Sequence, residues 1–138
     1  VIEYNVRMGD PETQVVLPRI KSDFLELMIR TANQTLNSFD LKIHEETYAN
    51  VVMVAGGYPE SYEKGNAITG IPKDNETSKI FHAGTKEIDN KLFTNGGRVL
   101  SVVSKGSSFK QALSKSYEIA EKIHFKDKNY RKDIGFDL

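Results

Sequence analysis

The chain has 138 residues, with 19 Lys and Arg, 19 Asp and Glu, and no cysteine. A formal net charge of zero argues against a protein that binds nucleic acid through bulk charge, and the lack of cysteine excludes disulfides and thiolate metal sites. The length suits one ordinary domain, or a small domain with part of another. No apolar run approaches the roughly 20 residues that cross a bilayer, and no signal peptide is visible, so we expect a cytoplasmic protein without a membrane anchor.

The first stretch, Val1 to Met8, alternates in a way that predicts a strand. Successive side chains of a strand point to opposite faces, so Glu3, Asn5 and Arg7 would share one face. A carboxylate, an amide oxygen and a guanidinium in a row suit a magnesium ion that carries phosphate. A half-exposed strand with a merely polar face has the same spacing, so the pattern alone leaves both interpretations open.

Two short helices are predicted after this strand. Asp10 is placed to cap a helix over residues 12–17, which Pro18 would end. Ser22 or Asp23 would cap a second helix over residues 24–36, whose apolar side chains we expect to pack beneath the first strand. The polar residues 37–46 then predict a linker that ends the first unit.

The remainder predicts an α+β unit, in which an antiparallel sheet is covered by a helix. Strands are expected at residues 48–55, 67–71, 79–85, 92–95 and 98–104, the last three as a meander. Asp89-Asn90 and Asn95-Gly96-Gly97 supply the turns of this meander. Ser108 and Gln111 form a capping box for a helix with an apolar stripe, and residues 126–138 are expected to be a charged tail.

Several strings resemble, in the same order, those of the glycinamide ribonucleotide synthetases, also called phosphoribosylamine–glycine ligases. They are E-Y-N-V-R-M-G-D-P-E-T-Q at the start, Gly56-Gly57-Tyr58-Pro59, Phe81-His82-Ala83-Gly84-Thr85, Thr94 to Leu100, and Tyr130 to Gly135. The resemblance covers essentially the whole chain. It implies that residues 1–37 end an ATP-grasp domain and that residues 38–138 form the small C-terminal α+β domain.

The resemblance also implies roles for the residues of the first strand. Glu3 and Asn5 would bind magnesium or manganese, Arg7 would neutralise charge on the transferred phosphate, and Asp10 would contact an amine or hydroxyl of phosphoribosylamine. Two alternatives stay open: Arg7 could form a salt bridge with Asp10 or Glu12, and Asp10 could serve only as a helix cap. The Thr94–Arg98 string could cradle a phosphate or simply form a hairpin.

The implied activity is the ATP-dependent ligation of glycine to 5-phosphoribosylamine in purine biosynthesis. Since Val1 already lies in the strand pattern, we expect a fragment that lacks an N-terminal part of the same chain and is inactive alone. Two alternatives are another ATP-grasp carboxylate–amine ligase, such as a biotin-dependent carboxylase, and a non-enzymatic binding module. Nucleotide binding by the full-length protein would distinguish these possibilities.

Overall fold

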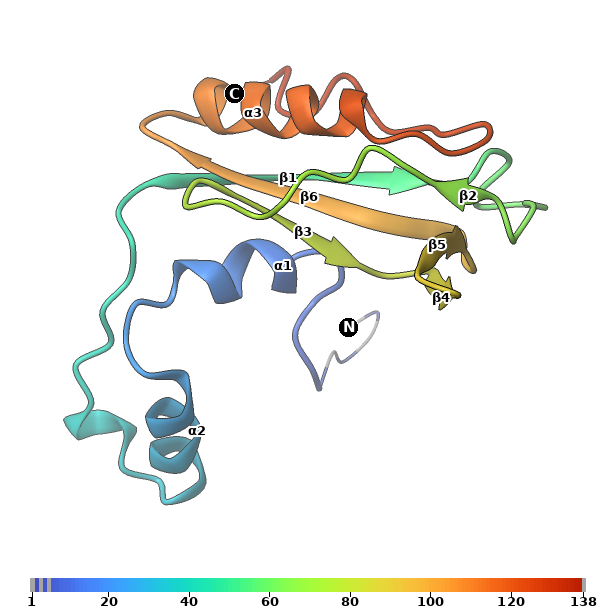
Figure 1. Ribbon diagram of the computed structural model, residues 1–138. Helices are drawn as coiled ribbons and strands as arrows, with labels where there is room; N and C mark the ends of the chain where they lie inside the picture. The colour runs from blue at the N-terminus through green and yellow to red at the C-terminus, as the bar shows by residue number, and fades with distance from the viewer. Residues whose placement is uncertain (1, 3, 5, 138) are drawn as a thin grey trace. The chain divides into compact units, whose positions relative to one another are not determined.

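The computed structural model describes residues 2, 4 and 6–137. These residues group into two compact units, Val1–Glu46 and Thr47–Leu138, called unit 1 and unit 2 below. Unit 1 is built from short helices, and unit 2 combines antiparallel sheets with one longer helix (Figure 1). The α+β fold class predicted for the second part of the chain is confirmed.

The predicted first strand is not formed in the described part of the N-terminal segment, where residues 2, 4 and 6–8 have no regular secondary structure. Ile2, Tyr4 and Val6 are almost fully exposed. A strand acquires its hydrogen bonds from a neighbouring strand, and no strand of the described residues pairs with this segment. Alternation alone therefore did not decide its structure.

The first helix begins later than predicted. It is α1, Thr13–Val16, and its N-cap residue is Glu12 rather than Asp10. The backbone N–H and the hydroxyl of Thr13 both donate to the carbonyl of Gly9, so the chain turns through residues 10–12 before the helix starts. Pro18 does not end the helical path, because a 3-10 turn, η1, follows over Leu17–Arg19. Proline is accepted near the start of such a turn, where its missing N–H needs no partner.

Helix α2, Phe24–Ala32, is capped by Asp23 as predicted, with the Glu26 N–H donating to the Asp23 carboxylate over 2.8 Å. It ends four residues before the predicted Leu36, because Gln34 takes a left-handed conformation with φ of 57°. The N–H groups of Gln34 and Thr35 then bond back to the carbonyls of Thr31 and Arg30. This is a Schellman arrangement formed without glycine.

After α2, the chain of unit 1 turns back and pairs with residues 19–20. A second 3-10 turn, η2, covers Leu36–Ser38. The residues that we predicted as a linker then pair with the end of η1 and the residue after it. The contacts are an Ile20–Ile43 bridge and a 2.8 Å bond from the His44 N–H to the Arg19 carbonyl. The end of the predicted linker is thus an ordered part of unit 1.

Unit 2 contains two three-stranded antiparallel sheets, ordered β1-β6-β3 and β2-β5-β4 (Figure 1). The strands are β1 Thr47–Val54, β2 Ala67–Ile68, β3 Ser78–His82, β4 Thr85–Ile88, β5 Lys91–Thr94 and β6 Arg98–Gly106. The long strand β6 is the centre of the first sheet. The valine-rich segment predicted as a buried strand is β1, which confirms that prediction.

The predicted meander is wrong in its connections. Asp89 and Asn90 do form the two-residue turn between β4 and β5, and both have positive φ as such turns require. The predicted strand 79–85 is divided, since β3 ends at His82 and β4 starts at Thr85. Strands β5 and β6 belong to different sheets, because β6 pairs with the distant β1 and β3 instead of its neighbour in sequence.

Helix α3, Phe109–Lys122, covers one face of the first sheet (Figure 1). The Gln111 N–H donates to the Ser108 hydroxyl, so the predicted cap is confirmed, while the Gln111 side chain accepts from the Ser107 N–H. Further along the helix, the buried Ser116 hydroxyl donates to the Ala49 carbonyl of β1 over 3.2 Å. The core between sheet and helix consists of fully buried Val51, Met53, Leu100, Val102, Ala120 and Ile123.

The C-terminal segment is packed rather than a solvated tail. Phe125 is buried in the core, and Tyr130 and Ile134 pack against it. Asn129 forms a bridge with Val54, with N–H···O distances of 2.8 and 3.0 Å. The apolar side chains spaced among the lysines explain why the segment folds back, since their burial outweighs the attraction of the charged residues for water.

Candidate functional site

Two of the four predicted site residues, Glu3 and Asn5, lie outside the residues that the structure describes. Within the described ranges, no cluster of three or more His, Asp or Glu side chains could hold a metal ion. The metal-binding role of Glu3 and Asn5 therefore stays a prediction. The chemistry of the pair does suit magnesium, which prefers hard oxygen ligands such as a carboxylate and an amide carbonyl.

Arg7 and Asp10 are both described and both exposed. The Arg7 guanidinium donates to the carbonyl of the adjacent Met8 over 3.0 Å. The alternative salt bridge from Arg7 to Asp10 or Glu12 stays untested. Since Glu12 is the N-cap of α1, the predicted capping role of Asp10 is wrong, and its predicted contact with substrate stays untested.

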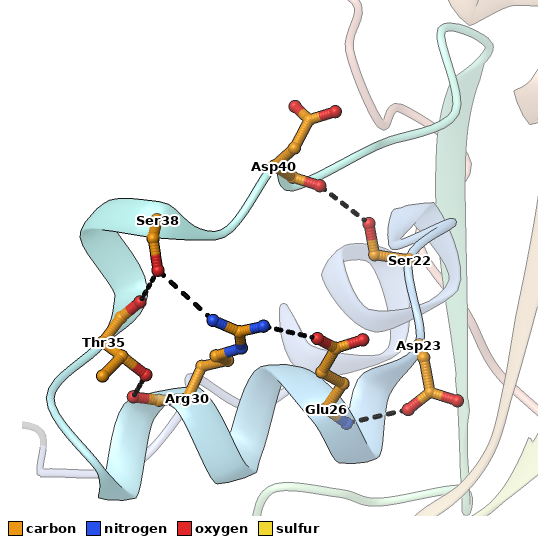
Figure 2. A network of polar contacts seen from close by, with 7 residues as sticks. All are labelled: Ser22, Asp23, Glu26, Arg30, Thr35, Ser38 and Asp40. Atoms are coloured by element: carbon orange, nitrogen blue, oxygen red, sulfur yellow. Dashed lines mark hydrogen bonds and ion pairs between the residues drawn. The ribbon is translucent and has the colours of Figure 1, made fainter.

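A polar network in unit 1 surrounds Arg30 of α2 (Figure 2). One guanidinium nitrogen bonds to Glu26 over 3.1 Å, and another donates to the Ser38 hydroxyl over 3.2 Å. Ser22 donates to the Asp40 carbonyl and accepts from the Lys42 N–H. These residues line an open hollow of about 390 Å³. Their hydrogen bonds attach η2 to α2 and hold residues 40–42 beside Ser22.

The glycine-rich strings of unit 2 meet at one end of the first sheet. We call Gly56, Gly57, Gly84, Gly96 and Gly97 the glycine junction. The Ala55 N–H donates to the Gly97 carbonyl over 2.8 Å, and the Asn95 N–H donates to the Gly84 carbonyl over 2.7 Å. A Cβ atom on Gly84 would lie 2.5 Å from the Gly96 Cα, so these backbones touch directly.

Close backbone contacts at the glycine junction explain why glycine stands in these strings. The Thr94–Arg98 string is not a hairpin, because it connects strands of different sheets. Gly96 and Gly97 are not among the described residues with positive φ, so they do not form a nest that alternates right- and left-handed residues. The phosphate contact of this string stays a prediction. His82 Nδ1 shares a 3.1 Å hydrogen bond with the Thr85 hydroxyl, which links the end of β3 to the start of β4.

Residues 48–137 match the phosphoribosylglycinamide synthetase C-domain family. The matched range covers most of the chain and nearly all of unit 2. The chain belongs to this family. Its α3-covered sheet and its glycine junction are thus features of a phosphoribosylglycinamide synthetase C domain.

The similarity to known proteins also extends over the N-terminal segment, which precedes the C-domain match. The phosphoribosylamine–glycine ligase of Fusobacterium nucleatum is 49% identical over 98% of this chain, which covers 32% of that protein. A bifunctional purine biosynthetic protein of Pichia angusta is 50% identical over 98% of this chain and 17% of its own length. A crystal structure of phosphoribosylamine–glycine ligase from Thermotoga maritima superposes with a TM-score of 0.73, at 41% identity, over 96% of this chain and 32% of that one.

The C-terminal segment of the C domain was missed by the sequence reasoning. Lys126 forms a 2.6 Å ion pair with Glu63, which lowers the pKa of the Glu63 carboxyl and raises the pKa of the Lys126 ammonium. The available signal was the presence of the large apolar side chains Phe125, Tyr130 and Ile134 among the charges, since burial of such side chains favours packing. Across the described residues, no helix has the length and apolarity to cross a membrane.

Proposed function

We propose that this chain is the C-terminal part of a phosphoribosylamine–glycine ligase. The single observation that carries the proposal is the identity of 49% with the Fusobacterium nucleatum ligase across 98% of the chain, including the E-Y-N-V-R-M-G-D-P segment outside the C-domain match. The chain spans about a third of the length of the ligases that it resembles. The activity therefore belongs to the longer protein, and we expect this chain to be inactive alone.

The proposed reaction joins glycine to 5-phosphoribosylamine and consumes ATP. A carboxylate oxygen of glycine attacks the γ-phosphorus, and the bond to ADP breaks. The amine nitrogen of phosphoribosylamine then attacks the acyl carbon, inorganic phosphate leaves, and the nitrogen loses a proton. Such reactions depend mainly on positioning and on charge stabilisation at the transferred phosphate.

Residues 1–37 would contribute the end of the ATP-grasp domain, and residues 38–138 the closing C-terminal domain. Bound magnesium or manganese would neutralise charge on the ATP phosphates, and Glu3 and Asn5 would hold it. Arg7 would stabilise negative charge on the transferred phosphate, because guanidinium groups bind phosphate oxygens in well-defined geometry. Asp10 would accept a hydrogen bond from an amine or hydroxyl of phosphoribosylamine.

The exposed apolar side of α2 supports the proposal that this chain packs against another part of a longer protein. Its apolar side chains Phe24, Leu25, Met28 and Ile29 are 43–69% exposed, although they follow helical spacing and lie together. Contiguous exposed apolar surface of this kind usually marks an interface. We infer that it packs against the remaining two thirds of the ligase, which would also supply the other contacts to ATP.

The test is to make this chain and the remaining part of the ligase separately and to measure ADP release with ATP, magnesium, glycine and phosphoribosylamine. We expect no turnover from this chain alone and turnover when both parts are mixed. ADP release by this chain alone would contradict the fragment interpretation. ADP release that depends on another carboxylate or amine would favour a different ligase. A full-length protein that binds no nucleotide would favour a binding module. The cytoplasmic location stays a prediction.

A further inference from the structure

We propose that residues 124–129 form a strap that holds the loop 56–65 in place, so that strap and loop open together as one cooperative unit, separately from the sheet. Proteins open locally in such units, which are often smaller than a domain. The proposal concerns unit 2 alone and does not depend on the activity proposed above.

The first observation is that the strap is attached at both ends to buried structure. At its start, His124 and Thr69 exchange two backbone hydrogen bonds of 2.9 Å, and Phe125 is buried in the core. At its end, Lys128 donates from its ammonium group to the carbonyls of Ala120 and Ile123 at the end of α3. These contacts make the strap an extension of α3.

The second observation is that the strap contacts the loop at two places and the end of β1, just before the loop, at a third. Asn129 bridges Val54 directly before the loop. Gly56 lies so close to Asp127 that an added Cβ would stand 2.8 Å from the Asp127 carbonyl oxygen and even closer to its Cβ. The Lys126–Glu63 ion pair then reaches the far side of the loop.

The third observation is that the loop has few hydrogen bonds of its own with which to resist opening. The Tyr58 N–H donates to the Ala55 carbonyl over 3.1 Å, and the Glu60 N–H donates to the Gly57 carbonyl over 2.9 Å. Most residues of the loop are exposed, so little apolar burial holds it. The end of the loop is held to β5, because the Gly65 N–H donates to the Thr94 carbonyl over 2.6 Å. The part from Gly56 to Glu63 therefore depends mainly on the strap and on the rings of Tyr58 and Tyr62 that lie on Gly97.

Hydrogen exchange of individual amides, measured by NMR on the 138-residue chain, tests this proposal. Gly56→Ala forces the loop and the strap apart, because the new methyl group meets backbone atoms of Asp127 that cannot rotate away. We expect the protection of the Tyr58, Glu60 and Asn129 amides to fall together by roughly tenfold. The amides of β6 should keep their protection.

A milder variant keeps the test valid if Gly56→Ala fails to fold. Lys126→Met removes the ion pair but keeps an unbranched side chain, and it should reduce the protection of the same three amides by about twofold to fivefold. Lys126→Arg should restore it. The matched control is Lys132→Met, a change at an exposed lysine outside the strap, which should alter none of these amides.

The pattern of change across the amides decides the outcome. Loss of protection in Tyr58 and Glu60 without a change in Asn129, or the reverse, would show that loop and strap open independently. An equal loss of protection in β6 would show that the variants merely destabilise the whole unit. Either result would overturn the proposal.

Discussion

The ammonium nitrogen of Lys128 lies 2.6 Å from the carbonyl oxygen of Ile123, directly after the last turn of α3. The same nitrogen also bonds to the carbonyls of Ala120 and Glu121, at 2.9 and 3.2 Å. The last carbonyls of a helix have no partner within the helix and carry partial negative charge. A lysine six residues beyond the helix thus serves as its C-terminal cap.

Lys128→Met should destabilise unit 2 by roughly 1–2 kcal/mol, because hydrogen bonds from a charged donor are lost while much of the side-chain volume is retained. The free energy of unfolding from urea titrations measures this effect. Lys132→Met is the control, because this exposed lysine lies in the same segment. Equal stability of the two variants would contradict the capping role.

Gly84→Ala should be among the most damaging single changes in the glycine junction. Its methyl group would lie 2.5 Å from the Gly96 Cα and 2.6 Å from the Arg98 carbonyl oxygen, which are backbone atoms with no rotamer to change. We expect a loss of about 3 kcal/mol, at the upper end of overpacking effects. Gly65→Ala provides the comparison, since nothing lies within 4 Å of its added Cβ and only its φ of 82° opposes the change. Its cost should be closer to about 1 kcal/mol, and urea unfolding of both variants checks the order.

The pKa of Glu63 predicts an acid-dependent opening of the strap. The hydrogen bond and the charge of Lys126 lower the pKa of this carboxyl below its usual value of 4.5. A carboxyl with a lowered folded pKa stabilises the fold fully above its unfolded pKa, and this contribution is lost as pH falls through the folded pKa. The exchange protection of the Tyr58 and Glu60 amides, corrected for intrinsic rates, should therefore decrease below pH 4.5.

Glu63→Gln should remove part of this pH dependence, whereas Glu76→Gln, in an exposed loop, should leave it unchanged. Asp133 contributes in the same direction, because Arg131 lowers the pKa of its carboxyl. The difference between the wild-type chain and Glu63→Gln therefore isolates the effect of the Glu63–Lys126 pair. Identical profiles for the two proteins would show that the pair has no influence on the strap.

Unit 2 should fold without unit 1. Residues 47–138 contain both sheets, α3 and the whole core cluster. We expect an excised 47–138 chain to protect the amides of β1 and β6 nearly as well as the 138-residue chain does. Uniformly fast exchange across these strands, with protection retained in the 138-residue chain, would show that unit 2 requires unit 1.

Glu3→Gln in the full-length ligase tests the proposed metal site. The variant keeps the size and a carbonyl oxygen but removes the charge, so we expect turnover to fall by about a hundredfold to a thousandfold, in line with other losses of electrostatic stabilisation. Tyr4→Phe, at the next position, should change turnover far less. Turnover measured over a range of magnesium concentrations, with a thermal melt of each variant, separates metal binding from folding. Near-normal turnover of Glu3→Gln at low magnesium would refute the assignment.

Local features of the fold were predictable from the sequence, and the pairing of strands was not. The valines of β1, the Asp89-Asn90 turn and the Ser108 cap each depend on a few neighbouring residues, so their patterns are visible in the chain. The position of β6 between β1 and β3 depends on contacts such as Val51 with Val102, which are distant in sequence and leave no local signal.

The candidate site was predictable only through resemblance. The alternation of Glu3, Asn5 and Arg7 equally fits an ordinary strand, and the described part of that segment has no strand. The strap was overlooked for a related reason: Phe125 and Tyr130 are separated by four residues, three of them charged, and composition concealed their apolar spacing.

The central position of β6 also determines when the first sheet can form during synthesis. Both of its neighbours, β1 and β3, leave the ribosome before β6 does, so neither has its partner when it emerges. At translation rates of about 5–20 residues per second, the chain carries two unpaired strands, one of them rich in valine, for seconds before Arg98–Gly106 arrives. The unpaired strand edges of the nascent chain are therefore open to aggregation in this interval. A chaperone that binds β1 and β3 would be most useful at this stage.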